Sequence, residues 1–242
     1  VIYVGGLNKN HTQDCEGGDR EHYQLPFGQD RLITELLAVN SNTVLVIVSG
    51  NAYEMPWIDK TPALVQSWYL GSEAGHALAD IISGDVCPSG KLPFSIAYQL
   101  TDYPAHKMGA VGYPGVSPDK LPQPFGGEEG KPMTSARLLK AAVEGWKGIN
   151  FCDEPGNGSM KDETEIYGED ILLGYRWFDY FKTKVRFPFG FGLSYTTFSY
   201  GKPTISGRTV SVSVRNSGKV LGQEVVQFYV GDDKASVIRP MK

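Results

Sequence analysis

Short apolar runs alternate with helix-like segments through the first hundred residues, and this order strongly constrains the fold. Apolar runs occur at 1–4, 43–48 and 63–68, with an amphipathic stretch at 29–39 between the first two and another at 72–82 after the third. The run at 43–48 is apolar at successive positions, as in a strand that is covered on both faces of a parallel sheet. Neighbouring parallel strands need crossover connections, which helices commonly supply. We therefore predict an α/β sandwich with a mostly parallel sheet.

The predicted helices begin and end at residues that suit those positions. In the segment 29–39 the apolar residues recur at helical spacing on one face. They are Leu32, Ile33, Leu36 and Leu37. In the segment 72–82, Ser72 is the predicted N-cap, and Gly84 follows the last apolar residue, as a glycine past a helix end commonly does. A further strand is predicted at 91–96.

A carboxyl group lies in a glycine-containing segment soon after the first apolar run. Residues 14–20 read Asp-Cys-Glu-Gly-Gly-Asp-Arg. Open α/β sheets gather ligand-binding residues beyond the carboxyl ends of their strands. Gly17 and Gly18 have no Cβ, so the backbone can turn sharply and a bulky substrate can come close. Glu16 is therefore the candidate catalytic residue.

Composition excludes several classes of function. Hydrophobic residues make up 41% of the chain, which is ample for a core, and the net charge of −4 comes without a basic cluster that would suggest nucleic acid. No apolar stretch is long enough to span a membrane. The cysteines, Cys15, Cys87 and Cys152, are too few and scattered for a disulfide framework or a zinc site, and His11 and His22 add no standard metal spacing. We expect no metal and no cofactor.

The middle of the chain departs from the α/β pattern. Residues 103–130 are rich in glycine and proline, and 134–146 have the pattern of a short amphipathic helix. We interpret 107–165 as an irregular insertion within an α/β domain that spans 1–200. Long excursions of this kind are often functional, so the insertion either shapes the mouth of a site or is a local decoration.

Further motifs follow the acidic segment in a fixed order. They are Leu25-Pro26 with Gln29, Ser49-Gly50-Asn51, Glu54-Met55-Pro56-Trp57, Trp68-Tyr69, Gly84-Asp85, Pro88 to Phe94, Tyr175 to Asp179, and Phe187 to Phe198. In this order they closely resemble the C-terminal half of family 3 glycoside hydrolases, the β-glucosidase and β-xylosidase family. The resemblance extends from about residue 1 to residue 242, with a poor match between about 109 and 165.

The resemblance implies a two-carboxylate mechanism. Retaining glycosidases use one carboxylate as nucleophile and a second carboxyl group as acid and then base. In the similar family, the nucleophilic Asp lies on an N-terminal (β/α)8 barrel, and the acid/base is commonly a Glu on the second domain. Glu16 stands in a Glu-Gly-x-Asp-Arg context that resembles the acid/base position of one large branch of the family.

No candidate for the nucleophile is present. The family carries it in a Ser-Asp-Trp-like context that this sequence lacks. Asp85 in a helix-ending turn and Asp59 in a polar connection are poor substitutes. We therefore expect a C-terminal portion of an exo-acting β-glucosidase, or one chain of a divided enzyme, that is inactive alone. Its expected partners are the missing barrel and a terminal β-D-glucosyl substrate, with β-xylosyl as the closest alternative.

The pattern changes to period two after residue 200. Residues 209–214 alternate strictly, and 224–230 form a second apolar run with aromatic residues. This looks like the opening of a fibronectin type III-like sandwich, which ends many members of the family. Such a sandwich needs about seven strands and roughly 100 residues, so we expect 201–242 to be an incomplete domain.

Another class of function fits part of the pattern. The chain is then a non-catalytic carbohydrate-binding or scaffolding module in which Glu16 is an ordinary loop residue. Trp57, Trp68, Trp177 and Phe178 would stack on sugars in such a module, but aromatic residues that flank strands more often pack in the core. A periplasmic or secreted location is expected, because bacterial members of the family are often found there.

Overall fold

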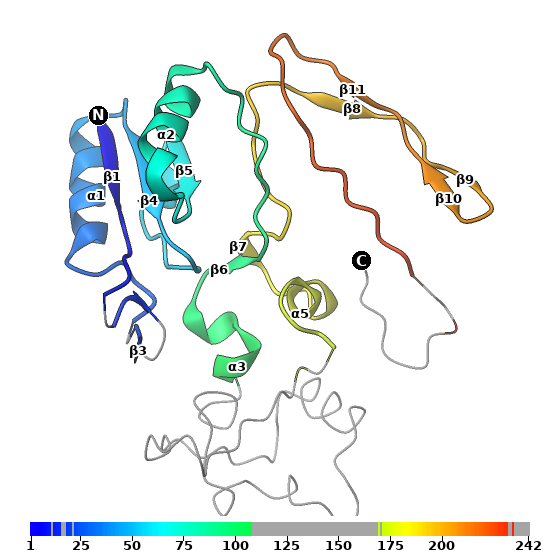
Figure 1. Ribbon diagram of the computed structural model, residues 1–242. Helices are drawn as coiled ribbons and strands as arrows, with labels where there is room; N and C mark the ends of the chain where they lie inside the picture. The colour runs from blue at the N-terminus through cyan, green and yellow to red at the C-terminus, as the bar shows by residue number, and fades with distance from the viewer. Residues whose placement is uncertain are drawn as a thin grey trace, which may run out of the picture. The chain divides into compact units, whose positions relative to one another are not determined.

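The computed structural model describes part of the chain, and this part forms two compact units (Figure 1). The described residues are 1–10, 12–15, 18–20, 22–107, 169, 171–231 and 234. The first unit comprises Val1–Phe94 and Pro188–Phe228, and the second comprises Ser95–Phe187 and Tyr229–Lys242. The predicted domain boundary at residue 200 stays a prediction, and the predicted helix at 134–146 lies outside the described residues.

A parallel sheet forms the centre of the first unit. It consists of β1 (Ile2–Gly6), β4 (Val44–Val48) and β5 (Ala63–Ser67), in the order β1-β4-β5. Both pairings are parallel, which confirms the predicted sheet. The side chains at the centre of the middle strand have no exposed surface, as its continuous apolar sequence predicts. These residues are Leu45, Val46 and Ile47.

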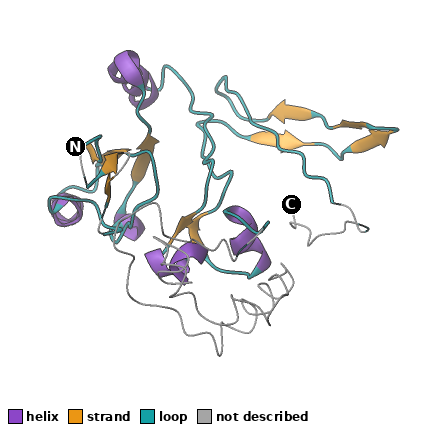
Figure 2. Ribbon diagram, turned by 60° about the horizontal axis from the view of Figure 1, so that its bottom comes forward, coloured by secondary structure: helices purple, strands orange, loops and turns teal. Residues whose placement is uncertain are grey.

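Two helices lie on opposite sides of this sheet (Figures 1 and 2). Helix α1 has the predicted bounds, Gln29–Val39, and buries Ile33 and Leu37. Leu32 was expected on the same face but is 48% exposed, because it lies at the margin of the apolar stripe. Helix α2 (Ala74–Ser83) follows the 3₁₀ helix η2 (Gly71–Glu73).

The ends of α2 follow the prediction on one side only. Gly84 ends the helix with a φ of 89°, a conformation that glycine adopts without strain. Ser72 was predicted as the N-cap, but it lies within η2, and the residue at the cap position is Glu73. The Glu73 carboxylate makes no cap hydrogen bond and instead lies 2.6 Å from Nδ1 of His76. The extra 3₁₀ turn moves the start of the α-helix past Ser72.

The side chain of Gln29 fastens the start of α1 to the end of β1. Its Nε2 donates to the carbonyl of Gly6 at 2.8 Å, and its Oε1 accepts from the Gly6 N–H at 2.7 Å. The Tyr3 hydroxyl donates to the same Oε1 at 2.9 Å. The point at which the chain leaves the sheet is therefore fixed by hydrogen bonds on both backbone groups of Gly6.

The second unit has a small core of its own. Strand β6 (Ile96–Ala97) pairs antiparallel with β7 (Val185–Phe187), and α5 (Tyr175–Tyr180) contributes the aromatic residues of the core. The buried residues of this cluster are Ala97, Leu172, Trp177 and Phe178. The 3₁₀ helix η3 (Leu100–Asp102) and the short helix α3 (Pro104–Lys107) complete the described part of this unit.

The strand predicted at 91–96 is wrong for most of its length, since only Ile96 lies in β6. Within the first unit, the N–H of Leu92 donates to the carbonyl of Phe191 at 2.8 Å, and the N–H of Gly190 donates to the carbonyl of Leu92 at 2.8 Å. Pro93 has no N–H, so it cannot extend this pairing into a ladder. The segment is a loop that makes one pair of backbone hydrogen bonds with residues 190 and 191.

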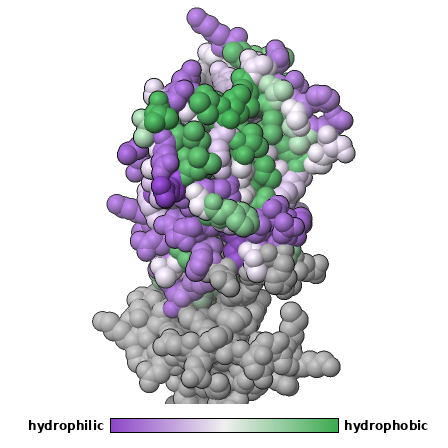
Figure 3. All heavy atoms as spheres, turned by 90° about the vertical axis from the view of Figure 1, so that its left-hand side faces the viewer, coloured by the Kyte–Doolittle hydropathy of each residue, from purple (hydrophilic) through white to green (hydrophobic). Residues whose placement is uncertain are grey.

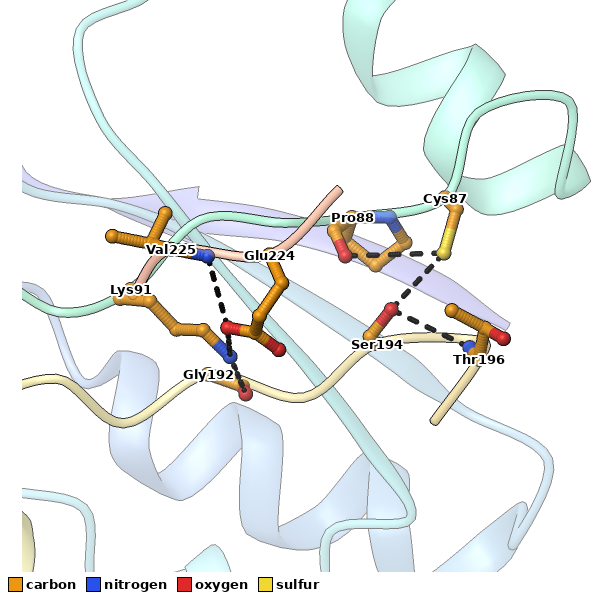
Figure 4. Close-up of polar contacts among 8 residues, drawn as sticks. All are labelled: Cys87, Pro88, Lys91, Gly192, Ser194, Thr196, Glu224 and Val225. Carbon is orange, nitrogen blue, oxygen red and sulfur yellow. Dashed lines mark hydrogen bonds and ion pairs between the residues drawn. The ribbon is translucent and has the colours of Figure 1, made fainter. Parts of the chain in front are cut away.

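Figure 4 shows how this loop contacts two later segments of the first unit. Nζ of Lys91 lies 3.2 Å from Oε1 of Glu224 and donates to the carbonyl of Gly192 at 2.8 Å. Sγ of Cys87 lies 3.1 Å from Oγ of Ser194. A Cβ at position 192 would lie 2.2 Å from the carbonyl oxygen of Gly90, so this close approach requires glycine. The segment 190–194, part of the motif Phe187 to Phe198, therefore packs directly against the 88–94 loop.

The residues after 197 form two short antiparallel pairs. Strand β8 (Phe198–Tyr200) pairs with β11 (Val214–Asn216), and β9 (Thr204–Ser206) pairs with β10 (Thr209–Ser211). The single strand predicted at 209–214 is therefore split between two pairs.

The strand predicted at 224–230 is absent from the described structure, and the fibronectin-like sandwich is not confirmed. A sandwich requires a second sheet to cover its inner face. Here Ile205 is 76% exposed and Leu221 is 91% exposed, so these apolar side chains are not part of a packed core. The period-two pattern correctly predicts strands in this segment, but it does not show whether another sheet covers them.

The face of the first unit that carries β1 and α1 exposes apolar side chains (Figure 3). Strand β1 is an edge strand of the described sheet. Ile2 and Val4, on the face of β1 opposite to Tyr3, are 58% and 60% exposed. Exposed apolar side chains on an edge strand are typical of a surface that another part of a protein covers.

We expect Leu45→Ala to lower the free energy of unfolding by about 3 kcal/mol, because it removes a fully buried side chain and leaves a cavity in the middle strand. Denaturant unfolding followed by circular dichroism measures the change. The matched control is Val39→Ala at the exposed end of α1, which should change stability by less than about 0.5 kcal/mol. Equal effects of the two changes would contradict the central position of β4.

Candidate functional site

Polar residues gather where the strands of the parallel sheet end. After β1, the chain forms a small antiparallel pair of β2 (Asp14–Cys15) and β3 (Gly18–Asp19), in which Asp14 lies opposite Asp19 and Cys15 opposite Gly18. After β4 come Ser49, Gly50 and Asn51, and shortly after β5 comes Tyr69. The carboxyl ends of parallel strands lie at one edge of a sheet, so these segments are brought together.

The carboxylate of Asp14 joins all three segments. Its Oδ2 accepts hydrogen bonds from the Gly50 N–H at 2.7 Å and from the Tyr69 hydroxyl at 2.8 Å. Its Oδ1 accepts from Nδ2 of Asn51 at 2.7 Å. The backbone N–H of Asp14 donates to the carbonyl of Asn8 at 3.2 Å. The β2–β3 pair is therefore tied to the segments that follow β4 and β5.

Arg20, directly after β3, makes the second attachment. Its Nη2 donates to Oδ1 of Asn51 at 2.7 Å and to the carbonyl of Ala52 at 2.7 Å. Asn51 thus donates to Asp14 and accepts from Arg20. The start of β2 and the residue after β3 are therefore both attached to the segment that follows β4.

Gly50 leaves the space that the Asp14 carboxylate occupies. A Cβ at position 50 would lie 2.8 Å from Oδ2 of Asp14 and 3.1 Å from Cε2 of Tyr69. An alanine at this position would force the carboxylate or the ring to move. The glycine of the Ser-Gly-Asn motif is therefore explained by close approach and not by an unusual backbone angle.

Tyr69 is a fixed donor in this cluster. Partial burial, the hydrogen bond to Asp14 and the charge of that carboxylate together raise the pKa of Tyr69 to about 12. The hydroxyl is therefore protonated at neutral pH and can donate to Asp14. Nζ of Lys9 lies 5.4 Å from the centre of the Tyr69 ring, within the range of a cation–π interaction.

Side chains of Ser49, Gln66 and Tyr53 stabilise the segment after β4 by hydrogen bonds. Ser49 is buried, and its hydroxyl donates to the carbonyl of Asn51. Nε2 of Gln66, on β5, donates to the carbonyl of Ser49 at 3.2 Å. The Tyr53 hydroxyl donates to Oε1 of Gln66 at 2.8 Å, and Tyr53 itself has no exposed surface. These contacts restrict the motion of the residues that hold Asp14 and Arg20.

Asp30, on α1, makes hydrogen bonds to Trp57, which follows β4 in the chain, and to the backbone of Leu25. Its Oδ1 accepts from Nε1 of Trp57 at 2.7 Å, and its Oδ2 accepts from the Leu25 N–H at 3.2 Å. Burial raises the pKa of Asp30, and these two hydrogen bonds oppose the rise. Trp57 is buried, so this aromatic residue is part of the core and does not face a ligand.

None of the carboxylates considered from the sequence as catalytic residues is described within the cluster around Asp14. Glu16 lies outside the described residues, although the strands on either side of it are described. Asp59 lies in the 3₁₀ helix η1 (Ile58–Lys60), and Asp85 follows α2, where it accepts from Oγ of Ser83 at 2.7 Å. Neither carboxylate belongs to the cluster around Asp14. Trp177 and Phe178 are buried in the second unit, as the core interpretation predicts.

Sequence reasoning did not identify Asp14, Asn51 or Tyr69 as parts of one cluster. A partial signal was present, because Asn51 and Tyr69 follow the predicted strands 43–48 and 63–68 almost directly, whereas Asp14 lies ten residues after the run 1–4. Among the described residues, no group of His, Cys, Asp and Glu side chains has the arrangement of a metal site. His11, one of the residues weighed as a ligand, lies outside them. No described helix is long and apolar enough to cross a bilayer.

A parallel α/β sheet with a polar cluster beyond its carboxyl ends has the arrangement of a ligand-binding domain. Residues 1–195 match the family described as the glycosyl hydrolase family 3 C-terminal domain. The chain therefore belongs to this family, as its motifs predict.

The relatives are β-glucosidases. The chain is 50% identical to beta-glucosidase BoGH3A of Bacteroides ovatus, over 100% of this chain and 27% of that protein. The structure of a Kluyveromyces marxianus beta-glucosidase in complex with glucose aligns with a TM-score of 0.69 and 35% identity, over 99% of this chain and 23% of that one. A Bifidobacterium adolescentis GH3 beta-glucosidase aligns with a TM-score of 0.67 and 31% identity, over 93% and 27%. The chain thus spans about a quarter of the length of these relatives.

We expect Asp30→Asn to change how stability depends on pH. Because the pKa of Asp30 is raised above its ordinary value of 3.8, the folded state holds this proton more tightly than the unfolded state. The contribution of Asp30 to the free energy of unfolding is fully present below pH 3.8 and is lost as pH rises through the folded pKa. Asp30→Asn should remove this loss.

Denaturant unfolding at a series of pH values above 3.8 measures the difference between parent and variant. Asp80→Asn, on the exposed surface of α2, controls for the loss of one negative charge. A difference between parent and Asp30→Asn that is constant with pH would contradict the assigned effect of burial.

Proposed function

We propose that this chain is the C-terminal part of a retaining, exo-acting β-glucosidase and that Glu16 is its general acid/base. The observation that carries the proposal is the attachment of the β2–β3 pair to the carboxyl ends of the sheet through Asp14 and Arg20. Glu16 lies between these two strands in the sequence. A general acid must be held in a defined place relative to its substrate, and this attachment supports such a role.

The proposed reaction has two steps. In the first, Glu16 donates a proton to the glycosidic oxygen while an Asp outside this chain attacks the anomeric carbon, so the leaving group departs as an alcohol. In the second, the Glu16 carboxylate takes a proton from water as that water displaces the nucleophile from the sugar. The second carboxylate must therefore come from another part of the complete protein.

The partner in this proposal is an N-terminal (β/α)8 barrel, and the substrate is a terminal β-D-glucosyl residue. The relatives are about four times longer than this chain, which leaves room for such a domain. The exposed apolar side chains of β1 support packing against a further part of the protein. A β-xylosyl substrate is the closest alternative, and we further propose a periplasmic or secreted location.

A chimaera tests the role of Glu16, with this chain replacing the corresponding segment of the Bacteroides ovatus β-glucosidase. Glu16→Ala should lower kcat/KM by about 100-fold or more on phenyl β-D-glucoside, whose poor leaving group needs a proton. On 2,4-dinitrophenyl β-D-glucoside the loss should be much smaller. Added azide should raise turnover of the dinitrophenyl substrate and yield the glucosyl azide, because it occupies the space left by the carboxyl group.

The control is Glu35→Ala, which removes an exposed carboxylate paired with Arg31 on α1 and should keep parental kinetics. If Glu16→Ala matched the parent on both substrates, Glu16 would not be the acid/base. If the parent chimaera folded but did not cleave either glucoside, the β-glucosidase proposal would fail. Sugar affinity without turnover would then favour the non-catalytic module.

A further inference from the structure

Asp14 stands two residues before Glu16, and its carboxylate makes none of its described contacts within the β2–β3 pair. All three hydrogen-bond donors come from the segments that follow β4 and β5. They are the Gly50 N–H, the Asn51 side-chain amide and the Tyr69 hydroxyl, at 2.7, 2.7 and 2.8 Å. The side chain therefore connects its own strand to the sheet and does little to stabilise the hairpin itself.

We propose that Asp14 is a positioning residue that fixes the acid/base carboxyl of Glu16 relative to the sheet. This inference rests on the role proposed for Glu16. Asp14 acts through the backbone of the β2–β3 pair and does not touch the reacting atoms.

The short connection makes the positioning effective. Consecutive Cα atoms are about 3.8 Å apart, and only Cys15 separates Asp14 from Glu16 in the sequence. The proposal requires that a shift of Asp14 also moves Glu16. Displacing a catalytic group by about 1 Å can lower the rate by about 100-fold.

The identity of the acceptor matters as well as its place. A carboxylate offers acceptor oxygens on both sides, whereas an amide offers one oxygen and one NH₂ group. In Asp14→Asn, the NH₂ group would face either the Asn51 amide or the pair formed by the Gly50 N–H and the Tyr69 hydroxyl. In both orientations donor meets donor, so part of the attachment to the sheet is lost.

Gly50 provides an independent way to disturb the same attachment. Gly50→Ala keeps the Asp14 carboxylate but would place a Cβ 2.8 Å from its Oδ2. The carboxylate must then move away from the Gly50 N–H. A positioning role predicts that Gly50→Ala and Asp14→Asn have the same kinetic signature, although one changes charge and the other changes only volume.

The experiment compares the two leaving groups in the Bacteroides chimaera. Asp14→Asn and Gly50→Ala should each lower kcat/KM on phenyl β-D-glucoside by about 10- to 100-fold and on 2,4-dinitrophenyl β-D-glucoside by less than about threefold. Azide should not restore turnover, because the Glu16 carboxyl group is still present. Tyr69→Phe, which removes one of the three donors, should show a smaller loss of the same kind.

Asp80→Asn is the matched control and should keep parental kinetics on both substrates. Equal losses on the two substrates, or parental values on both, would overturn the positioning role. Thermal unfolding identifies a variant that fails to fold, and if Asp14→Asn does so, Tyr69→Phe decides the question because it keeps the carboxylate. Glu16→Ala separates the two proposals. If its kinetics match those of the parent, the proposed acid/base role fails. If Glu16→Ala loses activity and azide restores it, while Asp14→Asn keeps parental kinetics, only the positioning role of Asp14 is overturned.

Discussion

The burial of β4 is the constraint on which the first unit depends. Its central residues have no polar side chains and no exposed surface, so both faces of this strand must be covered and a strand must lie on each side of it. The connections between these strands cross over, which makes the pairings parallel. Parallel strands end at one edge, and the polar residues after β1, β4 and β5 are therefore brought to the same place. The apolar sequence of β4 therefore determines where the cluster around Asp14 lies, although β4 itself contributes no residue to the cluster.

The cluster around Asp14 depends both on charged side chains and on the absence of a side chain at Gly50. Asp14 at the start of β2 and Arg20 directly after β3 provide opposite charges, and Asn51 donates a hydrogen bond to Asp14 and accepts one from Arg20. Gly50 contributes only the absence of a side chain, which admits the Asp14 carboxylate to the backbone N–H. The described donors to the Asp14 carboxylate are a backbone N–H, an amide and a phenol, and none of these three groups is charged.

Much of the sheet and α1 could be predicted because the signals are local. The continuous apolar run of β4 and the helical spacing of Ile33 and Leu37 each lie within one element. The failures share a different cause. The segments 91–96 and 224–230 have strand-like sequences, but pairing depends on neighbours that a local pattern does not contain. The three donors to Asp14 lie 36, 37 and 55 residues away from it in sequence, so their convergence follows from the topology of the sheet and not from any motif.

Two neighbouring carboxyl groups, Asp14 and Glu16, suit opposite tasks. A carboxylate has about four lone-pair positions, and Asp14 uses three of them for donors from the sheet edge. Such a group holds the chain in place, but it is not free to give a proton to a glycosidic oxygen and then take one from water. A general acid/base needs the reverse, a fixed backbone and a carboxyl group free to change its protonation state. The structure thus assigns the holding task to Asp14, and the proton transfer proposed for Glu16 depends on the two tasks being carried by different side chains.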